Sequence, residues 1–542
     1  MKKFTKLFLM SFMAAGLFSC SNDNEPVSPD QPVNPSGERI YMQFQLDMPS
    51  ASRSATDDAG NSNSNAKEDT EVGQDAENKV TDIQLLLVDA ATDKIIAKSA
   101  DGFTQKGTMC LVPFQSASLE ALAKKGEGTN VNVIAFCNYH AGATSVKAES
   151  YRDAKFALGG DGTTAAIWAN NHFMMTNANT AVCKLPALEQ LKQCTKEETA
   201  WNIGKISVER TAARFDFSPK TDGDYAVPDA GVNINVRLTH MAMFNISKEC
   251  YDLRRVSANG KGAGELFGKE LPWALSGSAY TGGNYVVDTD AANKVATNFL
   301  DNEEKDLDWT VISTLDQADS WKGNDKGNNA YYIWRYATEN TIPAGVSQKQ
   351  NIATGVSFKG EIVATASEDP IATEIAATIN AHTEPVYVLN GQLCGSWNTM
   401  EKLALSANDE GVLTNEALNG AYKVAKEILG QGSDKVAAAK SAGFSVYEPT
   451  GDKYLVYYNY YNRHNNNAGN VEEGKDANEV TAPMEFAVVR NNVYKLKVDK
   501  INKLGTPNWE KPGDIDIETE DVFFQVSVEI LPWTVRVNNI EL

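Results

Sequence analysis

The chain is poor in the residue types from which most catalytic and metal sites are built. Its 542 residues include five histidines and seven cysteines. Neither a His-Glu-x-x-His nor a Gly-x-Ser-x-Gly motif occurs, and no two cysteines are spaced as Cys-x-x-Cys. We therefore expect no catalytic residue, no bound metal and no cofactor, and a protein that is not an enzyme.

Dense clusters of basic residues are also missing. The chain has 50 lysines and arginines against 71 aspartates and glutamates, which gives a net charge of −21 at pH 7. Beyond the first residues no basic block is available to bind phosphates, so we expect no nucleic acid partner. The acidic stretch 301–308 has the oxygen ligands that calcium prefers, but it lacks the spacing of a calcium loop. We favour a solvated loop there.

The N-terminal segment has the pattern of an export signal. Lysines at positions 2, 3 and 6 precede an apolar run, residues 7–17, which is too short to cross a bilayer of about 30 Å as a helix. The run ends at Leu17-Phe18-Ser19-Cys20, which looks like a bacterial lipobox with Cys20 as the lipidated residue. The alternative is a plain secretory signal in which Cys20 is incidental. We predict a signal peptide over residues 1–19 and export through the periplasm, as a lipoprotein, to the outer membrane.

Strand patterns dominate the rest of the chain. Short runs rich in Val, Ile, Phe and Tyr recur between turn-forming segments, and residues 232–238 alternate strictly between apolar and polar. Helical patterns are few, and the best ones cover residues 119–125, 187–194 and 415–429. The sequence predicts an all-β protein of antiparallel sandwiches with a few inserted helices, and a domain boundary near residues 205–220.

Two further features leave alternatives open. Cys183 and Cys194 are close enough in sequence to pair as a disulfide, although the remaining cysteines form no framework. Aromatic clusters at 331–336 and 454–461 could stack on sugar rings, but aromatic residues within strands more often fill a sandwich core.

The first strand-like segment lies next to a candidate protease site. Residues 41–48 alternate, and their apolar side chains share one face: Met42, Phe44, Leu46 and Met48. Arg53 follows five residues later among small residues, so a trypsin-like or Arg-specific protease is expected to cut between Arg53 and Ser54. Arg39 is a weaker second candidate. Residues 54–79 are rich in Ser, Asn, Asp and Glu and extend this accessible stretch.

The C-terminal segment contains a second strand pattern. Residues 522–530 alternate, Leu531-Pro532 breaks the phase because proline cannot donate to a strand ladder, and the alternation then resumes. The simpler interpretation is a last strand that folds back on its own sheet. The functional interpretation is a strand offered to another molecule, with these apolar residues as the donor: Trp533, Val535, Val537, Ile540 and Leu542.

Four segments carry a family resemblance. Residues 40–53 (IYMQFQLDMPSASR), 208–214 (VERTAAR), 487–504 (AVVRNNVYKLKVDKINKL) and 526–542 (VSVEILPWTVRVNNIEL) resemble the short-fimbria fimbrillins of the Bacteroidetes, of the Mfa type. The resemblance implies two transthyretin-like β-sandwich domains, export as a lipoprotein and cleavage after an arginine that corresponds to Arg53. It divides the chain into a signal peptide (1–19), a propeptide (20–53), an N-terminal domain (54–212) and a C-terminal domain (213–542) that includes a polymerisation strand (522–542).

The resemblance also implies a function. Loss of residues 20–53 would remove the first strand and leave an open groove, which a neighbour's C-terminal strand could fill. Such head-to-tail contacts need not close and would build a fimbrial stalk that supports adhesion and biofilm formation. The implied partners are other copies of this chain, accessory anchor and tip subunits, the processing protease, and receptors on host or bacterial surfaces. The alternative is a surface-anchored lipoprotein that binds glycans through its aromatic clusters.

Overall fold

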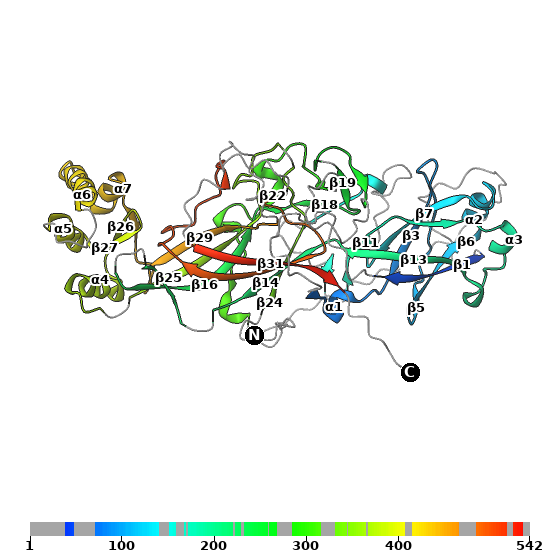
Figure 1. The fold of residues 1–542 in the computed structure, drawn as a ribbon, viewed down its shortest axis with the longest axis horizontal. Coiled ribbons are helices and arrows are strands. Elements are labelled where there is room, and N and C mark those ends of the chain that lie inside the picture. Colours follow the sequence, from blue (N-terminus) through cyan, green and yellow to red (C-terminus); the bar gives the residue numbers. More distant parts are fainter. Residues whose placement is uncertain are drawn as a thin grey trace, which may run out of the picture.

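A computed structural model describes residues 38–47, 71–139, 151–158, 167–169, 172–220, 223–228, 232–257, 259–267, 285–315, 331–343, 345–364, 367–406, 415–464, 484–517 and 524–534. Figure 1 shows an elongated molecule in which an N-terminal group of strands, a central group of strands and a small helical unit follow one another along the long axis. Strands dominate these residues, so the predicted all-β class is confirmed.

The N-terminal sheet has nine strands. Their order is β4-β3-β7-β11-β13-β1-β6-β5, and β12 pairs with β7 beside this path. In chain order they are β1 (Arg39–Asp47), β3 (Ile83–Asp89), β4 (Ile95–Lys98), β5 (Thr104–Lys106), β6 (Met109–Gln115), β7 (Asn130–Cys137), β11 (Met175–Asn177), β12 (Ala181–Lys184) and β13 (Trp201–Arg210).

This sheet curls around one apolar core. A backbone bridge joins Ser99, which follows β4, to Phe114 in β6, so the two ends of the sheet meet. All seven residues of β3 are buried, as expected of a strand that is covered on both faces. The short helices α2 (Ser116–Ala123) and α3 (Leu188–Leu191) lie against the same core and contribute Leu119, Leu122 and Leu191 to it.

The central part is a sandwich of two five-stranded sheets. One sheet has the order β2-β31-β30-β14-β24, and the other has the order β15-β16-β25-β29 with β23 on β16. The ring centroids of Phe217 in β14 and Phe358 in β25 lie 5.6 Å apart, which shows that the inner faces are in contact. The strands are β2 (Glu71–Val72), β14 (Ala213–Ser218), β15 (Tyr225–Ala226), β16 (Ile234–Phe244), β23 (Thr310–Val311), β24 (Tyr332–Ala337), β25 (Gly355–Ala364), β29 (Leu455–Tyr461), β30 (Asn492–Ile501) and β31 (Phe524–Thr534).

Small sheets connect and cover these bodies. They are formed by β8 (Lys155–Ala157) with β18 (Glu249–Tyr251), by β9 (Trp168–Ala169) with β10 (His172–Phe173), by β17 (Ile246–Ser247) with β22 (Phe299–Leu300), and by β19 (Arg255–Ser257) with β20 (Glu265–Leu266) and β21 (Tyr285–Val286). Single 3₁₀ turns lie at Tyr151–Asp153, Glu197–Thr199, Ala296–Asn298, Glu304–Asp306 and Ile312–Thr314.

The helical unit is an insertion between β25 and β29. It contains α4 (Pro370–Ala381), α5 (Trp397–Leu405), α6 (Asn415–Gly430) and α7 (Lys435–Ser441), which pack on β26 (Val386–Leu389), β27 (Gln392–Gly395) and β28 (Ser445–Tyr447). The predicted helix over 415–429 corresponds to α6, in which the buried side chains are Leu418, Tyr422 and Ala425. The predicted helices over 119–125 and 187–194 correspond to α2 and to the much shorter α3.

Three details differ from the sequence-based expectations. The sheets are not purely antiparallel, because three pairs run parallel: β1 with β13, β14 with β30, and β2 with β31. Residues 203–217, one of the runs rich in Val, Ile and Phe, form two strands and not one, and the chain moves from the N-terminal sheet to the central one between Arg210 and Ala213. The strand near Pro532 does not break there, because β31 continues to Thr534. The predicted domain limits themselves stay a prediction.

Candidate functional site

The strand β1 lies inside the N-terminal sheet and not at its edge. It runs antiparallel to β6, with Arg39 opposite Gln115 and Gln45 opposite Met109. On its other side it runs parallel to β13, from Met42 opposite Trp201 to Asp47 opposite Ser207. Removal of this one segment would therefore leave two neighbouring strands with unpaired backbone groups.

The side chains of β1 fill the core as the alternation predicts. Met42 and Phe44 are fully buried, Ile40 is buried beside them, and Leu46 is partly buried against the same cluster. Met48 lies outside the described residues. Burial of three apolar side chains at roughly 1.5–3 kcal/mol each amounts to about 5–9 kcal/mol of gross stabilisation.

Polar contacts fix the register of β1 between its neighbours. The Tyr41 amide donates to the Cys194 carbonyl at 2.8 Å, beyond the regular ladder. The Gln43 side-chain amide donates to the Ala200 carbonyl at 3.3 Å, and Lys205 Nζ lies 2.6 Å from Asp47 Oδ2. These partners belong to β13 and to the segment before it, so the groove contains anchors for the backbone as well as apolar pockets.

The thiol of Cys110 lies beneath this strand. Cys110 is opposite Phe44 in the pairing of β6 with β1, and its side chain is fully buried. Burial raises the pKa of this thiol to about 12. All six cysteines in the described part of the chain are buried free thiols, so Cys183 and Cys194 do not pair.

The C-terminal strand β31 lies on its own protomer. It pairs antiparallel with β30 from Phe524 opposite Ile501 to Pro532 opposite Asn492. Trp533 and Thr534 then pair in parallel with Glu71 and Val72 of β2. Of the five predicted donor residues, Trp533 is thus held in its own sheet, and the other four lie outside the described residues, as do Cys20, Arg53 and Ser54.

The segment 208–214 contributes to a buried ionic cluster at the junction of the two bodies. Its centre is Glu77 in the short helix α1 (Asp75–Asn78), which is 1% exposed. Glu77 accepts from Arg214 Nη1 at 3.1 Å and from the Tyr336 hydroxyl at 2.6 Å, and its backbone carbonyl accepts from Arg210 Nε at 3.2 Å. Arg214 also forms a two-pronged pair with Asp216. We call these residues the Glu77 cluster.

A second buried charged cluster contains Glu209 of β13 together with Arg254, Glu339 and Arg490. Arg490 Nη2 lies 2.6 Å from Glu339 Oε2, and Arg254 Nε lies 3.2 Å from Glu209 Oε1. The Arg490 guanidinium also donates to the backbone carbonyl of Asp252. Burial raises the pKa of Glu209 and of Asp252 to about 7. Glu209, Arg210 and Arg214 of the segment 208–214 and Arg490 of the segment 487–504 are thus part of buried charged clusters.

The other sequence candidates do not form a ligand site. Arg335 lies 3.1 Å from Asp301 and Lys511 pairs with Glu303, so two carboxylates of the acidic stretch have cationic partners in the protein, and no group of metal-ligating side chains occurs among the described residues. In the aromatic cluster of β29 the rings of Tyr454, Tyr457 and Tyr458 are buried in the core. These three rings are not open for stacking on sugars, whereas Trp334 and Tyr336 of the cluster at 331–336 are half-buried, so the glycan-binding alternative stays a prediction.

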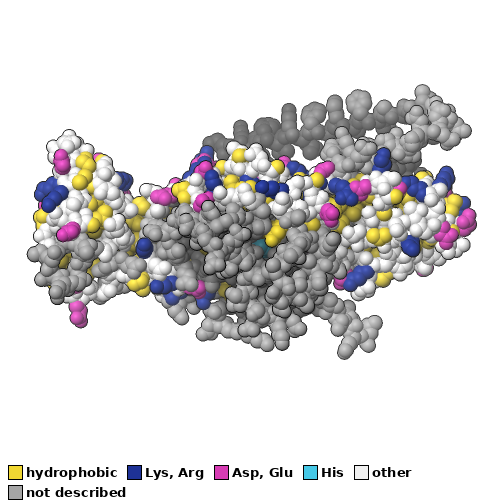
Figure 2. Space-filling view, turned by 45° about the horizontal axis from the view of Figure 1, so that its top comes forward, with side chains coloured by type: hydrophobic (Ala, Val, Ile, Leu, Met, Phe, Trp, Pro, Cys, Tyr) yellow, Lys and Arg dark blue, Asp and Glu magenta, His cyan; other side chains and the backbone are white. Residues whose placement is uncertain are grey.

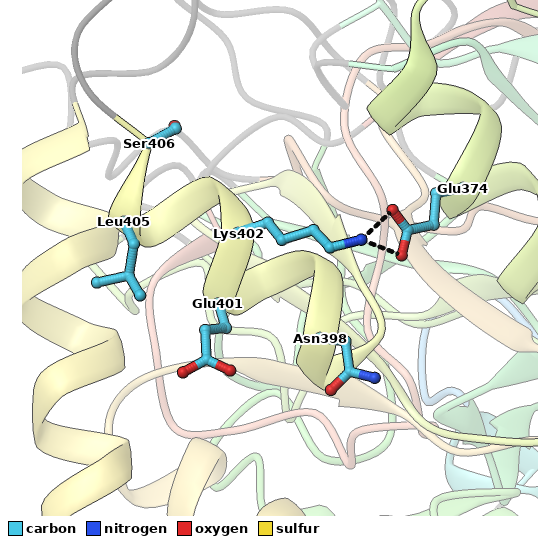
Figure 3. Close-up of a pocket in the computed structure, with 6 residues that line it drawn as sticks. All are labelled: Glu374, Asn398, Glu401, Lys402, Leu405 and Ser406. Carbon is cyan, nitrogen blue, oxygen red and sulfur yellow. Dashed lines mark hydrogen bonds and ion pairs between the residues drawn. The ribbon is translucent and has the colours of Figure 1, made fainter.

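The helical unit has an open hollow of about 570 Å³ on its surface, between α4 and α5 (Figure 3). Both carboxylate oxygens of Glu374 lie 2.7 Å from Lys402 Nζ, so the cation at its centre is already paired. Glu401, which Figure 3 shows pointing away from that pair, accepts from Lys426 at 3.1 Å and from the Tyr422 hydroxyl. The charged side chains that line the hollow, Glu374, Glu401 and Lys402, are thus paired within the protein.

The described part of the surface in Figure 2 has no large basic patch. Basic and acidic side chains are interspersed at both ends of the visible face. Within the described residues no helix combines the length and the apolar character needed to span a bilayer.

Comparison with known proteins identifies the C-terminal region. Residues 452–539 match the family model described as major fimbrial subunit protein type IV, fimbrillin, C-terminal. This region of the chain is similar to the C-terminal part of a fimbrillin. The matched region includes the strands β29, β30 and β31 of the central sandwich. Of these, β31 also pairs with β2. The predicted resemblance to Bacteroidetes fimbrillins is confirmed.

Solved structures give weaker similarities. A candidate cell adhesion protein from Parabacteroides distasonis is 12% identical, with coverage of 92% of this chain and 98% of that chain and a TM-score of 0.38. A fimbrilin (FimA) from Porphyromonas gingivalis is 13% identical, with coverage of 91% and 98% and a TM-score of 0.37. The tip fimbrial protein Mfa3 from the same species is 9% identical, with coverage of 91% and 100% and a TM-score of 0.29. All three TM-scores are below 0.5. No curated protein matches the chain.

Proposed function

We propose that the protein is a structural subunit of a cell-surface fimbria, which polymerises when proteolysis releases β1 and a neighbouring copy supplies a replacement strand. The observation that supports this most strongly is the position of β1. It is an internal strand whose Ile40, Met42 and Phe44 side chains are buried, and the covalent chain connects it to the rest of the fold only through the segment that contains Arg53. The fimbrillin match of residues 452–539 supports the same role.

The physical basis is an exchange of one strand for another. A protomer without β1 would expose the backbone of β6 and β13 together with the pockets of Ile40, Met42 and Phe44. The C-terminal segment of another copy carries alternating apolar residues that suit such pockets. Because the groove and the segment lie on different parts of one protomer, each contact leaves a free groove and a free segment, and a filament grows.

The full pathway that we propose begins with export as a lipoprotein on Cys20. Cleavage between Arg53 and Ser54 by a trypsin-like or Arg-specific protease then separates the lipid anchor and β1 from the body. The subunit belongs to the stalk, where it contacts other copies of itself, anchor and tip subunits, and receptors on neighbouring surfaces. While β1 remains attached it occupies the groove and prevents premature assembly.

Cleavage-site variants test this proposal. The exported chain is treated with an Arg-specific protease, and fibres are followed by light scattering and electron microscopy. Wild-type protein is expected to form fibres, whereas Arg53→Ala protein stays monomeric because β1 remains tethered. Arg39→Ala serves as the matched control and polymerises normally. Fibres from the Arg53→Ala protein, or stable monomers from fully cleaved wild-type protein, would contradict the proposal.

A further inference from the structure

We propose that β2 is a clamp that holds β31 in its own protomer as far as Thr534, so that the segment passed to a neighbouring copy begins at Val535. This inference rests on the proposed function and adds to it a boundary between the part of the C-terminal region that stays and the part that moves. It assigns a positioning role to residues 71–72, which no sequence motif marked.

The pairing of β31 shows why a clamp is needed. One edge of β31 pairs with β30 along Phe524–Pro532. Among the described strands only β2 covers the other edge, and it does so at Trp533 and Thr534. Strand pairs open from their ends, so a strand that is paired on one side alone is easily peeled away once its end is pulled. We call residues 535–542 the tail. The two residues of β2 pair with the C-terminal end of β31, which is the end that a pull on the tail would open first.

The clamp is fixed to the body by a buried charge. Only Gly73 and Gln74 separate β2 from α1, and the Gln74 amide donates to Glu77 Oε2 at 2.6 Å. Glu77 is in turn held by the Glu77 cluster, whose arginines come from β13 and β14. Figure 1 shows α1 at the tip of β31, between the N-terminal and central bodies. The position of β2 is therefore set by both bodies at once.

Proteolysis at Arg53 would leave this arrangement intact. Arg53 precedes β2 in the chain, so the cut separates β1 from the body but leaves β2 attached through α1. Two different segments thus have two different roles. Release of β1 opens the groove, and β2 holds the end of β31 from which the tail begins. The tail would leave each protomer from one fixed point, which sets the spacing of neighbouring subunits.

This arrangement changes the role that the sequence alone suggests for Trp533. Its backbone pairs with Glu71 in the same protomer. The apolar residues that remain available for transfer are Val535, Val537, Ile540 and Leu542.

A reversible covalent lock tests the clamp. Val72 and Thr534 are direct partners on adjacent parallel strands, which are about 4.8 Å apart, within the range that a disulfide can bridge. The Val72→Cys/Thr534→Cys full-length protein is oxidised, cleaved with the Arg-specific protease, and compared with the same sample under reductant. We expect equal rates of fibre formation, because β2 and β31 need not separate. If oxidation blocks fibre formation and reductant restores it, β31 leaves β2 during assembly and the clamp is wrong.

Loosening the clamp gives the complementary test. The Glu71→Pro/Val72→Pro protein lacks the amide donors of β2 and is expected to polymerise at least fivefold more slowly after cleavage, with the wild-type extent of cleavage. Asp75→Pro is the matched control, since the first position of a helix accepts proline, and it polymerises at the wild-type rate. A wild-type rate for the double variant would overturn the inference. Failure of cleaved wild-type protein to polymerise would instead refute the proposed function, so the two failures are distinguishable.

Discussion

Buried charges at the junction are the most unusual feature at the residue scale. Arg210, Arg214 and Arg490 are among the largest fully buried side chains, and each has a polar partner. Buried ion pairs contribute little net stability compared with apolar residues, but loss of one partner costs about 3–5 kcal/mol because the other charge stays buried. We therefore interpret these pairs as determinants of how the N-terminal and central bodies fit together.

Asp252 is expected to make stability depend on pH. Burial raises the pKa of its carboxyl to about 7, against the opposing effect of Arg490, while Glu209, Glu339 and Arg254 complete the charged surroundings. Between pH 4 and pH 7, approximately, the folded state keeps a proton that the unfolded state releases, so the free energy of unfolding falls as pH rises through that window.

Asp252→Asn tests this expectation by thermal unfolding at pH 5 and pH 8. The variant lacks the ionisable group, so its stability relative to the wild type should increase by about 1–4 kcal/mol between the two pH values. Asp452→Asn, at an exposed turn, is the control and should follow the wild type. Parallel curves for wild type and Asp252→Asn would show that this carboxyl is not the source of any pH dependence.

At the scale of elements, β1 is the part that determines assembly. Phe44 is fully buried, whereas Gln45, its neighbour on the same strand, is exposed. Phe44→Ala should lower the free energy of unfolding of the uncleaved protein by about 3–5 kcal/mol, because a large side chain is lost from the core. After cleavage the same variant should polymerise faster than wild type, since the leaving strand is bound less tightly.

Gln45→Ala is the matched control for this prediction, and it should change neither quantity appreciably. Denaturant unfolding of the uncleaved proteins and light scattering of the cleaved ones measure the two effects. Slower polymerisation of cleaved Phe44→Ala protein would mean that release of β1 does not limit assembly.

Local sequence patterns predicted which helices and strands form better than they predicted which strands pair with one another. The alternation in 41–48 identified the buried face of β1, and the helical pattern over 415–429 identified α6, because these signals lie within one element. That β1 is parallel to β13 depends on a partner more than 150 residues away, about which its own sequence contains no information.

The helices α4, α5 and α7 were not predicted from the sequence, although each begins with an N-cap residue that the sequence shows. Asp369 accepts from the Ala372 amide, Ser396 from the Thr399 amide and Asp434 from the Ala437 amide, each as a helix N-cap. In α7 the only large apolar residue is Val436, so the hydrophobic period is weak there. In α5 the buried residues Trp397, Met400 and Leu403 have helical spacing, and this signal was missed because the segment has only nine residues. The strand through Pro532 was missed for a different reason. A proline is tolerated there because, among the described strands, only β30 pairs at that position.

At the scale of the whole molecule, the fold separates the groove from the tail. The groove lies in the N-terminal sheet, whereas β31 ends at the junction with the central sandwich. The helical unit is at the opposite end of the long axis (Figure 1). A filament built by strand exchange would therefore place the N-terminal body of one copy against the exit point of the next.

The composition of assembled fibres tests this account most directly. Fibres formed from cleaved wild-type protein are washed, dissolved in denaturant and analysed by quantitative mass spectrometry for the peptide that contains residues 40–47. The account predicts that this peptide is absent from the fibres and is recovered in the supernatant in equal molar amount to the polymerised subunit. Fibres that retain one copy of the peptide per subunit would contradict it.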